Sequence, residues 1–152
     1  MAKVEYLVLT PEQLTYHQED ENILVEQLTP VMEKLRDQYA SQGWKGIVHP
    51  RTGAEHAVRE FELVKVEDGW VAFSLVEPWF TTEHILTEEF IVDVPVPVAV
   101  ALLEFLASKA KATRLMVGTR AAPNGRHFGL AKIYSQYGLV PSTIELTKEI
   151  DL

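Results

Sequence analysis

Three basic side chains lie close together in the sequence, just before a predicted helix near the C-terminus. Arg120, Arg126 and His127 occupy a short loop and the start of that helix. A positive group at a helix N-terminus opposes the helix dipole unless an anion lies nearby. The cluster therefore predicts contact with a phosphate or an acidic partner. The alternative is a solvated loop whose long side chains point into water.

The other reactive residue types exclude several chemistries. The chain has no cysteine, which excludes disulfides, thiolate nucleophiles and cysteine-bound metals. Its five histidines form no His-x-x-x-His pair that would put two ligands on one helix face, so we expect no metal site. The sequence has no Gly-x-Ser-x-Gly elbow, no Gly-x-Gly-x-x-Gly motif and no phosphate-binding Gly-Lys-Ser/Thr motif. Hydrolase, dinucleotide-binding and nucleotide-binding functions therefore lose support.

Composition indicates one ordinary globular domain spanning residues 1–152. With 47% hydrophobic and 24% charged residues, the chain has enough apolar surface to form a single core. A formal net charge of -8 would repel a phosphate backbone, so we expect no nucleic-acid partner. The N-terminus lacks a leader pattern and no apolar run approaches the ~20 residues of a membrane span. We therefore expect a cytoplasmic protein with no membrane partner.

The N-terminal third predicts a strand followed by helices and a loop. Val4–Leu9 alternates and is β-rich, and Thr10–Gln13 has the capping residues of a helix that begins at Pro11. From Asp20 onward, apolar residues recur every three or four positions. Pro30 interrupts that pattern, so we expect two short helices ending near Gly43. Glycine, proline and histidine then predict a mobile loop over residues 43–57.

The remaining sequence alternates strands and helices. A hairpin is expected, with Gly69 providing a positive φ in its turn. A strand, a buried helix and a second strand should then form a βαβ unit with parallel strands. The predicted elements are the strands Val58–Val66, Trp70–Val76, His84–Val94, Arg114–Thr119 and Thr143–Lys148, a helix opened by Pro97 and running to Ala112, and a last helix that ends at Gly138.

Four segments resemble motifs of the GNAT superfamily of N-acetyltransferases, in the order found in that family. Val66–Phe73 is similar to its hairpin and Phe90–Pro95 to its central strand and turn. Leu102–Thr119 resembles the helix and strand that follow, and Ala131–Leu139 the terminal Ala-x-Leu-Tyr-x-x-x-Gly-Phe motif. The resemblance implies an α/β fold with a mixed, mostly antiparallel sheet flanked by helices. It also implies that the two parallel strands part around a V-shaped opening.

One motif of that family is absent. The turn after the central strand should carry Arg or Gln and two glycines, whose backbone N–H groups hold the pyrophosphate of acetyl-CoA. The sequence has Val94-Pro95-Val96-Pro97-Val98-Ala99-Val100 instead. Neither proline has an N–H, and the valines restrict close approach to the backbone. The resemblance therefore implies acetyl-CoA as cofactor, whereas these residues make its binding doubtful.

The resemblance also assigns roles to individual residues. The base would be Glu88 or Glu89, the oxyanion donor the backbone of Val92 or Val94, and the proton donor to the thiolate Tyr134. The basic cluster before the last helix would contact the cofactor phosphates. The alternatives are a solvated strand face for the glutamates and a core position for Tyr134.

Three functions remain open from the sequence. The chain is an acetyl-CoA-dependent N-acetyltransferase whose catalysis is weak or lost, or a non-enzymatic protein on the same fold. In the second case it would resemble short tailed-phage proteins, as a virion component or an inhibitor. The third function is a homo-oligomeric or protein-binding domain that uses Trp44, Trp79 and Phe80 as anchors.

Overall fold

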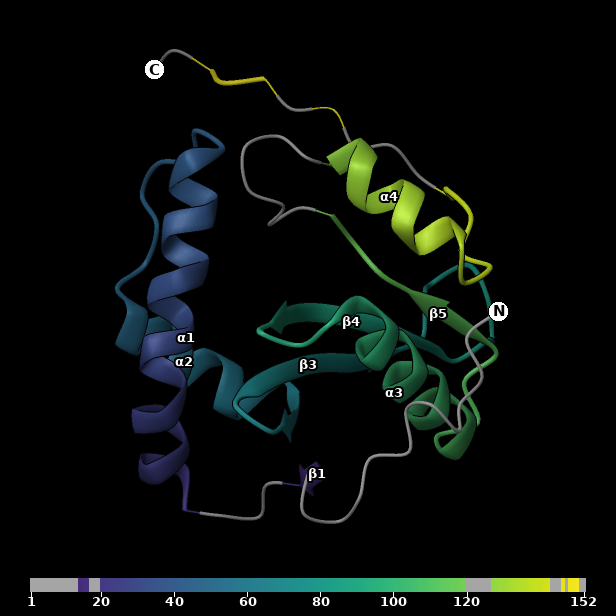
Figure 1. Cartoon of the computed structure of the whole chain (residues 1–152), viewed down its shortest axis with the longest axis horizontal. Coiled ribbons are helices and arrows are strands. Elements are labelled where there is room, and N and C mark those ends of the chain that lie inside the picture. Colours follow the sequence, from purple (N-terminus) through teal and green to yellow (C-terminus); the bar gives the residue numbers. More distant parts are fainter. Residues whose placement is uncertain (1–13, 17–19, 120–126, 143–145, 147, 151–152) are drawn as a thin grey trace.

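A computed structural model describes residues 14–16, 20–119, 127–142, 146 and 148–150 of the chain (Figure 1). The described part of the chain forms strands and helices. In order they are β1 (Leu14–Tyr16), α1 (Glu21–Ser41), α2 (Pro50–Glu60), β2 (Glu62–Val66), β3 (Gly69–Val76), β4 (Ile85–Val92), α3 (Val96–Lys109), β5 (Arg114–Met116) and α4 (His127–Ser135).

The strands form one mixed sheet in the order β1-β2-β3-β4-β5. The first four pair antiparallel, whereas β4 and β5 are parallel. The helix α3 joins these two parallel strands and packs on them, which completes a βαβ unit. The predicted mixed, mostly antiparallel sheet with a C-terminal βαβ unit is confirmed.

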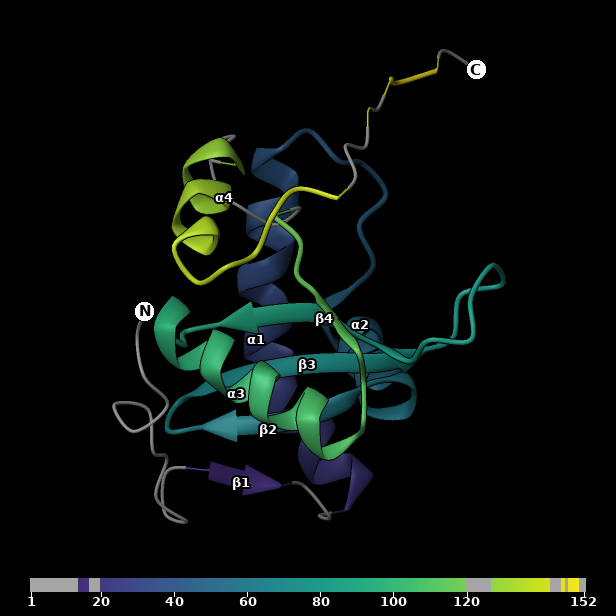
Figure 2. The same cartoon turned by 90° about the vertical axis from the view of Figure 1, so that its right-hand side faces the viewer.

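Helices cover both faces of the sheet (Figures 1 and 2). On one face, α1 and α2 bury Leu28 and Ala54 against Trp70 and Phe90. On the other face, α3 buries Leu103 with neighbouring apolar residues against the inward side chains of β2, β3 and β4. Figure 2 shows α4 on the α3 side of the sheet. The core therefore has two layers, separated by the strands.

The prediction that Pro30 divides the first helical region is wrong, because α1 continues through it. A proline inside a helix costs ~3 kcal/mol. The α1 helix buries Leu24, Val25, Leu28, Val31 and Leu35 along one stripe, and each such side chain contributes ~1.5–3 kcal/mol. The burial of this stripe outweighs the cost of the exposed proline.

The loop predicted over residues 43–57 is also shorter than expected, since α2 begins at Pro50. His49 caps this helix, with its Nδ1 accepting a hydrogen bond from the Arg51 N–H at 3.1 Å. Proline suits the first helical position, where its missing N–H has no partner to lose. Residues 58–60, which the sequence predicts to be part of the following strand, belong to α2 as well.

Two predictions near the N-terminus and the hairpin need further correction. The segment 14–16 forms β1 rather than continuing a helix from Pro11. Glu67, with φ 53°, occupies the left-handed position of the hairpin turn, whereas Gly69 is the first residue of β3. A Cβ on Gly69 would lie 2.4 Å from the carbonyl oxygen of Asp93. This glycine therefore permits close packing rather than a turn.

Some predicted segments lie partly or wholly outside the described residues. This holds for the strand Val4–Leu9 and for most of the strand Thr143–Lys148; the described residues 146 and 148 belong to no strand. Of the strand predicted over residues 114–119, only the part from Arg114 to Met116 pairs with β4. The helix predicted from Pro97 starts one residue earlier, at Val96.

Candidate active site

A cavity of about 190 Å³ opens where β4 and the chain after β5 part. The parallel pairing runs from Ile85↔Arg114 to Thr87↔Met116 and stops there, although β4 continues to Val92. Figure 1 shows the chain after β5 diverging from β4. The predicted V-shaped opening is therefore present, and it lets side chains from both faces of the sheet reach one space. The cavity is lined by Leu35, Gln38, Tyr39, Glu88, Glu89, Phe90, Ile91, Val94, Val96, Gly118, Thr119, Leu130 and Tyr134.

An irregularity in β4 sets the direction of its two glutamates. Ala72 pairs with Phe90 and Phe73 with Glu88, so Glu89 has no partner on β3 and forms a bulge. A bulge shifts the alternation of side chains along a strand. Leu86 accordingly lies on the α3 face, whereas Phe90 lies on the α1 face. The bulge thus lies at the opening, where pairing with β5 has already ended.

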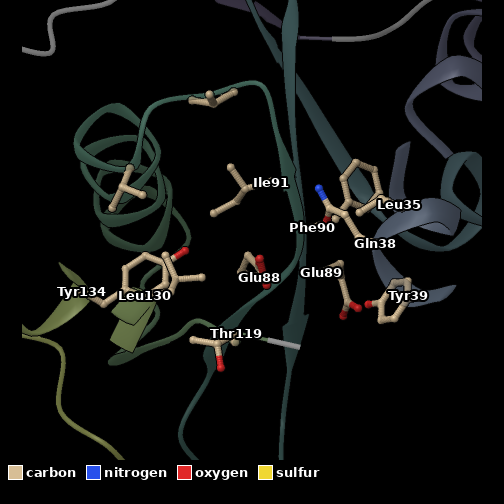
Figure 3. Close-up of a pocket in the computed structure, with 13 residues that line it drawn as sticks. Leu35, Gln38, Tyr39, Glu88, Glu89, Phe90, Ile91, Thr119, Leu130 and Tyr134 are labelled. Carbon is tan, nitrogen blue, oxygen red and sulfur yellow. The ribbon is translucent and has the colours of Figure 1, made fainter. Parts of the chain in front are cut away.

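Glu88 and Tyr134 approach each other inside the cavity. Both side chains are buried, with 8% and 6% of their surface exposed, although they come from β4 and α4. Burial and, to a smaller extent, the negative charge of Glu88 raise the pKa of Tyr134 to about 12. Figure 3 shows the two side chains on the same side of β4. Tyr134 is therefore a neutral hydrogen-bond donor at neutral pH.

Glu89 is placed differently from its neighbour. Figure 3 shows its carboxylate directed toward Tyr39 of α1, across β4 from Tyr134. Its side chain is only partly buried. The two adjacent glutamates therefore line opposite sides of the cavity, and only Glu88 lies close to the phenol.

The two valines predicted as cofactor contacts also differ in position. Val94 is buried and lines the cavity. The Val92 side chain packs in the core on the α1 face instead. Beyond them, Pro95 is the N-cap of α3 without a side-chain capping bond, and Pro97 is in the first helical turn. The turn expected to hold a pyrophosphate thus lacks N–H groups at two of its positions.

An ion pair lies beside this turn. The ammonium of Lys34, on α1, binds the carboxylate of Asp93, which directly follows β4. Asp93 has a left-handed backbone with φ 56°. The pair joins α1 to the start of the β4–α3 turn and neutralises both charges.

Other predicted and unpredicted residues complete the description of the site. Arg120 and Arg126 lie outside the described residues, and His127 is the first residue of α4. Gln38 and Tyr39 of α1 and Thr119 line the cavity without having been predicted. Tyr39 belongs to the apolar pattern predicted from Asp20 onward, but no sequence signal linked that pattern to β4.

The described residues form neither a metal-binding cluster nor a membrane-spanning helix. Within those ranges, no three His, Cys, Asp or Glu side chains gather closely enough to hold a metal ion. The described helices include none with the length and apolar character that crossing a bilayer requires.

Several solved structures similar to this chain are described as acetyltransferases. A probable acetyltransferase superposes with a TM-score of 0.59 at 16% identity, covering 91% of this chain and 97% of its own. A ribosomal-protein-alanine N-acetyltransferase from Brucella melitensis biovar Abortus 2308 gives 0.58 at 18% identity, with 90% and 97% covered. An aminoglycoside acetyltransferase from an uncultured soil metagenomic sample gives 0.57 at 13% identity, with 91% and 99% covered.

These neighbours are GNAT-family acetyltransferases, and the chain has their fold. At such identities the likeness establishes the fold alone. No protein-family model matches the chain, and no curated protein does.

Proposed function

We propose that this chain transfers an acyl group from a thioester to an amine and that it binds acyl-CoA weakly. The observation that carries the proposal is the meeting of buried Glu88 and Tyr134 in a cavity at the opening between β4 and β5. A buried carboxylate beside a buried phenol is the pair of groups that acyl transfer to an amine requires. The fold shared with acetyltransferases supports the same chemistry.

Glu88 is the proposed base. An alkylammonium must lose a proton before its nitrogen can attack, and a carboxylate within reach, or one water away, can accept it. The nitrogen lone pair then forms a C–N bond to the thioester carbonyl carbon. The C–S bond breaks, and its electron pair leaves with the sulfur as a thiolate. Glu88 holds the first proton that the nitrogen releases, and the second, which leaves the nitrogen as the amide forms, passes through water to the departing thiolate. The products are an amide, a free thiol and the protonated carboxyl group of Glu88.

Tyr134 is the proposed donor to the leaving sulfur. With a pKa of about 12 its hydroxyl remains protonated at neutral pH. A tyrosinate is a stronger base than a thiolate, whose acid has an ordinary pKa of ~8.5. Tyr134 therefore stabilises the thiolate by donating a hydrogen bond and keeps its own proton.

Glu89 and the backbone after β4 have supporting roles in this proposal. The carboxylate of Glu89 points toward Tyr39 of α1. In this proposal it attracts the cationic acceptor before the acceptor is deprotonated. Val94, which lines the cavity, is better placed than Val92 for its backbone to stabilise the oxyanion. The cavity lining contains these two carboxylates and no basic side chain among the described residues, which favours an amine as acceptor.

Acetyl-CoA remains the proposed acyl donor, with weak binding. A cavity of about 190 Å³ is smaller than the ~300–1,000 Å³ of a pocket for a whole ligand. It suits the thioester end, and the proline-containing turn offers few donors to the pyrophosphate. Weak binding of the donor makes catalysis slow at ordinary donor concentrations, although the proposed reacting groups are present.

Thiol release tests this proposal. The purified chain is incubated with acetyl-CoA at millimolar concentration and a panel of amines, and free thiol is measured with time. We expect amine-dependent release, and Tyr134→Phe should lower kcat without raising the KM for the donor. Release that is independent of amine, or unaffected by Tyr134→Phe, would count against the proposed chemistry.

A non-enzymatic function has support from one surface feature. Trp79 and Phe80, in the connection between β3 and β4, are 96% and 72% exposed, and their rings contact each other edge to face at 5.8 Å. Figure 2 shows this connection extending beyond the sheet. Exposed aromatic pairs anchor protein interfaces. A structural or inhibitory role, including that of a phage virion component, is therefore the alternative. It would be favoured if the chain released no thiol and instead self-associated in a way that Trp79→Ala abolishes.

A further inference from the structure

The turn between β4 and α3 has few free backbone donors. The first four N–H groups of a helix have no partner within it. In α3 these positions begin with Pro95 as N-cap and include Pro97, and a proline supplies no N–H. The next N–H group, of Ala99, is already bonded to the Pro95 carbonyl at 2.9 Å. Only Val96 and Val98 remain as donors at this end of the helix.

The charges beside the turn are equally unfavourable for an anion. Asp93 places a half-exposed carboxylate directly before the turn, and Lys34 is held by that carboxylate. A phosphate approaching here would have to compete with Asp93 for the ammonium. The whole chain adds a net charge of -8, which repels a multiply charged nucleotide over longer distances.

Close packing also fixes the turn against rearrangement. Gly69, at the start of β3, lies so near to it that a Cβ there would be 2.4 Å from the Asp93 oxygen and 2.5 Å from Val94 Cγ2. The Val94 side chain is buried in the core below α3. The backbone therefore cannot move toward β3 to expose other donors.

The reacting end of the cavity has the opposite character. Ile91 and Leu130 line the cavity with apolar side chains on the same side of β4 as the carboxylate of Glu88 and the phenol of Tyr134 (Figure 3). Such a space accepts a thioester and the start of an uncharged arm. It gives no reason for the donor to carry a nucleotide.

We propose that the site recognises its donor through the thioester and pantetheine arm alone, so that its substrate class is an acyl-pantetheine thioester with or without a nucleotide. This inference rests on the proposed acyl transfer. It adds that the adenosine diphosphate of acetyl-CoA contributes almost nothing to kcat/KM. The donor can reach the site as a small thioester or on the phosphopantetheine of a carrier protein.

Parallel assays with acetyl-CoA and acetyl-pantetheine, which share the thioester, test the inference. We expect kcat/KM values within about threefold of each other. A value for acetyl-CoA more than about thirtyfold higher would overturn the inference while leaving acyl transfer intact. Acetylated acyl carrier protein distinguishes the sources: a higher kcat/KM than for acetyl-pantetheine assigns the donor to a carrier, and an equal or lower value assigns it to a small thioester.

Matched variants of the Lys34–Asp93 ion pair distinguish an effect of charge on the nucleotide of the donor from an effect on acyl transfer itself. Asp93→Asn should raise kcat/KM for acetyl-CoA severalfold by releasing Lys34, and Lys34→Met should lower it severalfold by leaving Asp93 unneutralised. Both variants should leave the kcat/KM for acetyl-pantetheine unchanged. Equal effects on the two donors would contradict the inference.

Binding provides a readout that does not need turnover. If neither thioester is consumed with any amine, the proposed acyl transfer fails. Thermal unfolding with CoA or with pantetheine then still tests the inference. Equal shifts of the melting temperature support it, and stabilisation by CoA only overturns it.

Discussion

Tyr134 of α4 is buried beside Glu88 of β4, and the carboxylate adds to the effect of burial in raising the pKa of the phenol to about 12. The ordinary value is ~10. The folded chain therefore holds the Tyr134 proton more tightly than the unfolded chain does. This stabilisation is fully present below pH ~10 and is lost as pH rises from ~10 to ~12.

The first prediction concerns stability at high pH. The free energy of unfolding should fall between pH 9 and pH 12 by about 1–3 kcal/mol more in the wild type than in Tyr134→Phe, at ~1.4 kcal/mol per pKa unit. Urea unfolding at several pH values measures the difference. Glu88→Gln should reduce the slope without removing it, because burial is the larger cause. Identical slopes for wild type and Tyr134→Phe would contradict the placement of this phenol.

The two glutamates should have different effects on catalysis. Glu88→Gln removes the carboxylate beside Tyr134 and should lower kcat about 10²–10⁴-fold, the usual contribution of a general base. Glu89→Gln, on the opposite side of the cavity, should mainly raise the KM for the amine. Steady-state kinetics of thiol release with both substrates varied checks this. The roles of the two glutamates would have to be exchanged if Glu89→Gln gave the larger loss of kcat.

The sequence indicated the sheet and the proposed reacting residues better than it indicated the residues around them. The turn at residues 67–69 and the β-rich segments around it identified the β2–β3 hairpin, and the terminal motif singled out Tyr134. The side of β4 on which each glutamate lies depends on the bulge at Glu89. A bulge is a property of strand pairing, and the Glu-Glu pair alone carries no signal for it. Pro30 likewise predicted a break between two helices. The helix continues because its apolar stripe is buried, and that burial depends on tertiary packing, which the local sequence does not show.

A third prediction compares two glycines. Gly69→Ala should destabilise the chain by about 1–3 kcal/mol, since the added Cβ meets the backbone of Asp93. Gly129, inside α4, has nothing within 4 Å of an added Cβ, so Gly129→Ala should stabilise by up to ~1 kcal/mol through helix propensity. Chemical denaturation measures both. Equal tolerance at the two sites would show that the β4–α3 turn is not held as tightly as the structure has it.

A fourth prediction follows from the continuous α1 helix. Pro30 is exposed within the helix, so Pro30→Ala should restore a backbone N–H without loss of packing. It should raise the free energy of unfolding by about 1–3 kcal/mol. Denaturant unfolding measures the change, and Thr29→Ala, which removes a hydroxyl bonded to the Val25 carbonyl at 2.7 Å, serves as a comparison. A destabilised Pro30→Ala chain would instead support two separate helices.

The last prediction is the affinity for acetyl-CoA, which we expect to be in the millimolar range or below detection by calorimetry. A charge-assisted hydrogen bond to a phosphate contributes ~1.5–3 kcal/mol, so the loss of two such bonds weakens binding by about two to four powers of ten. Pro95→Ala with Pro97→Ala restores two N–H groups at the start of α3 and should strengthen acetyl-CoA binding at least tenfold. The double variant Arg120→Ala with Arg126→Ala measures how much the basic cluster before α4 contributes to the affinity for acetyl-CoA. Micromolar binding by the wild type that persists in that double arginine variant would mean that the cofactor is held by other groups, because neither the turn nor the cluster could then account for it.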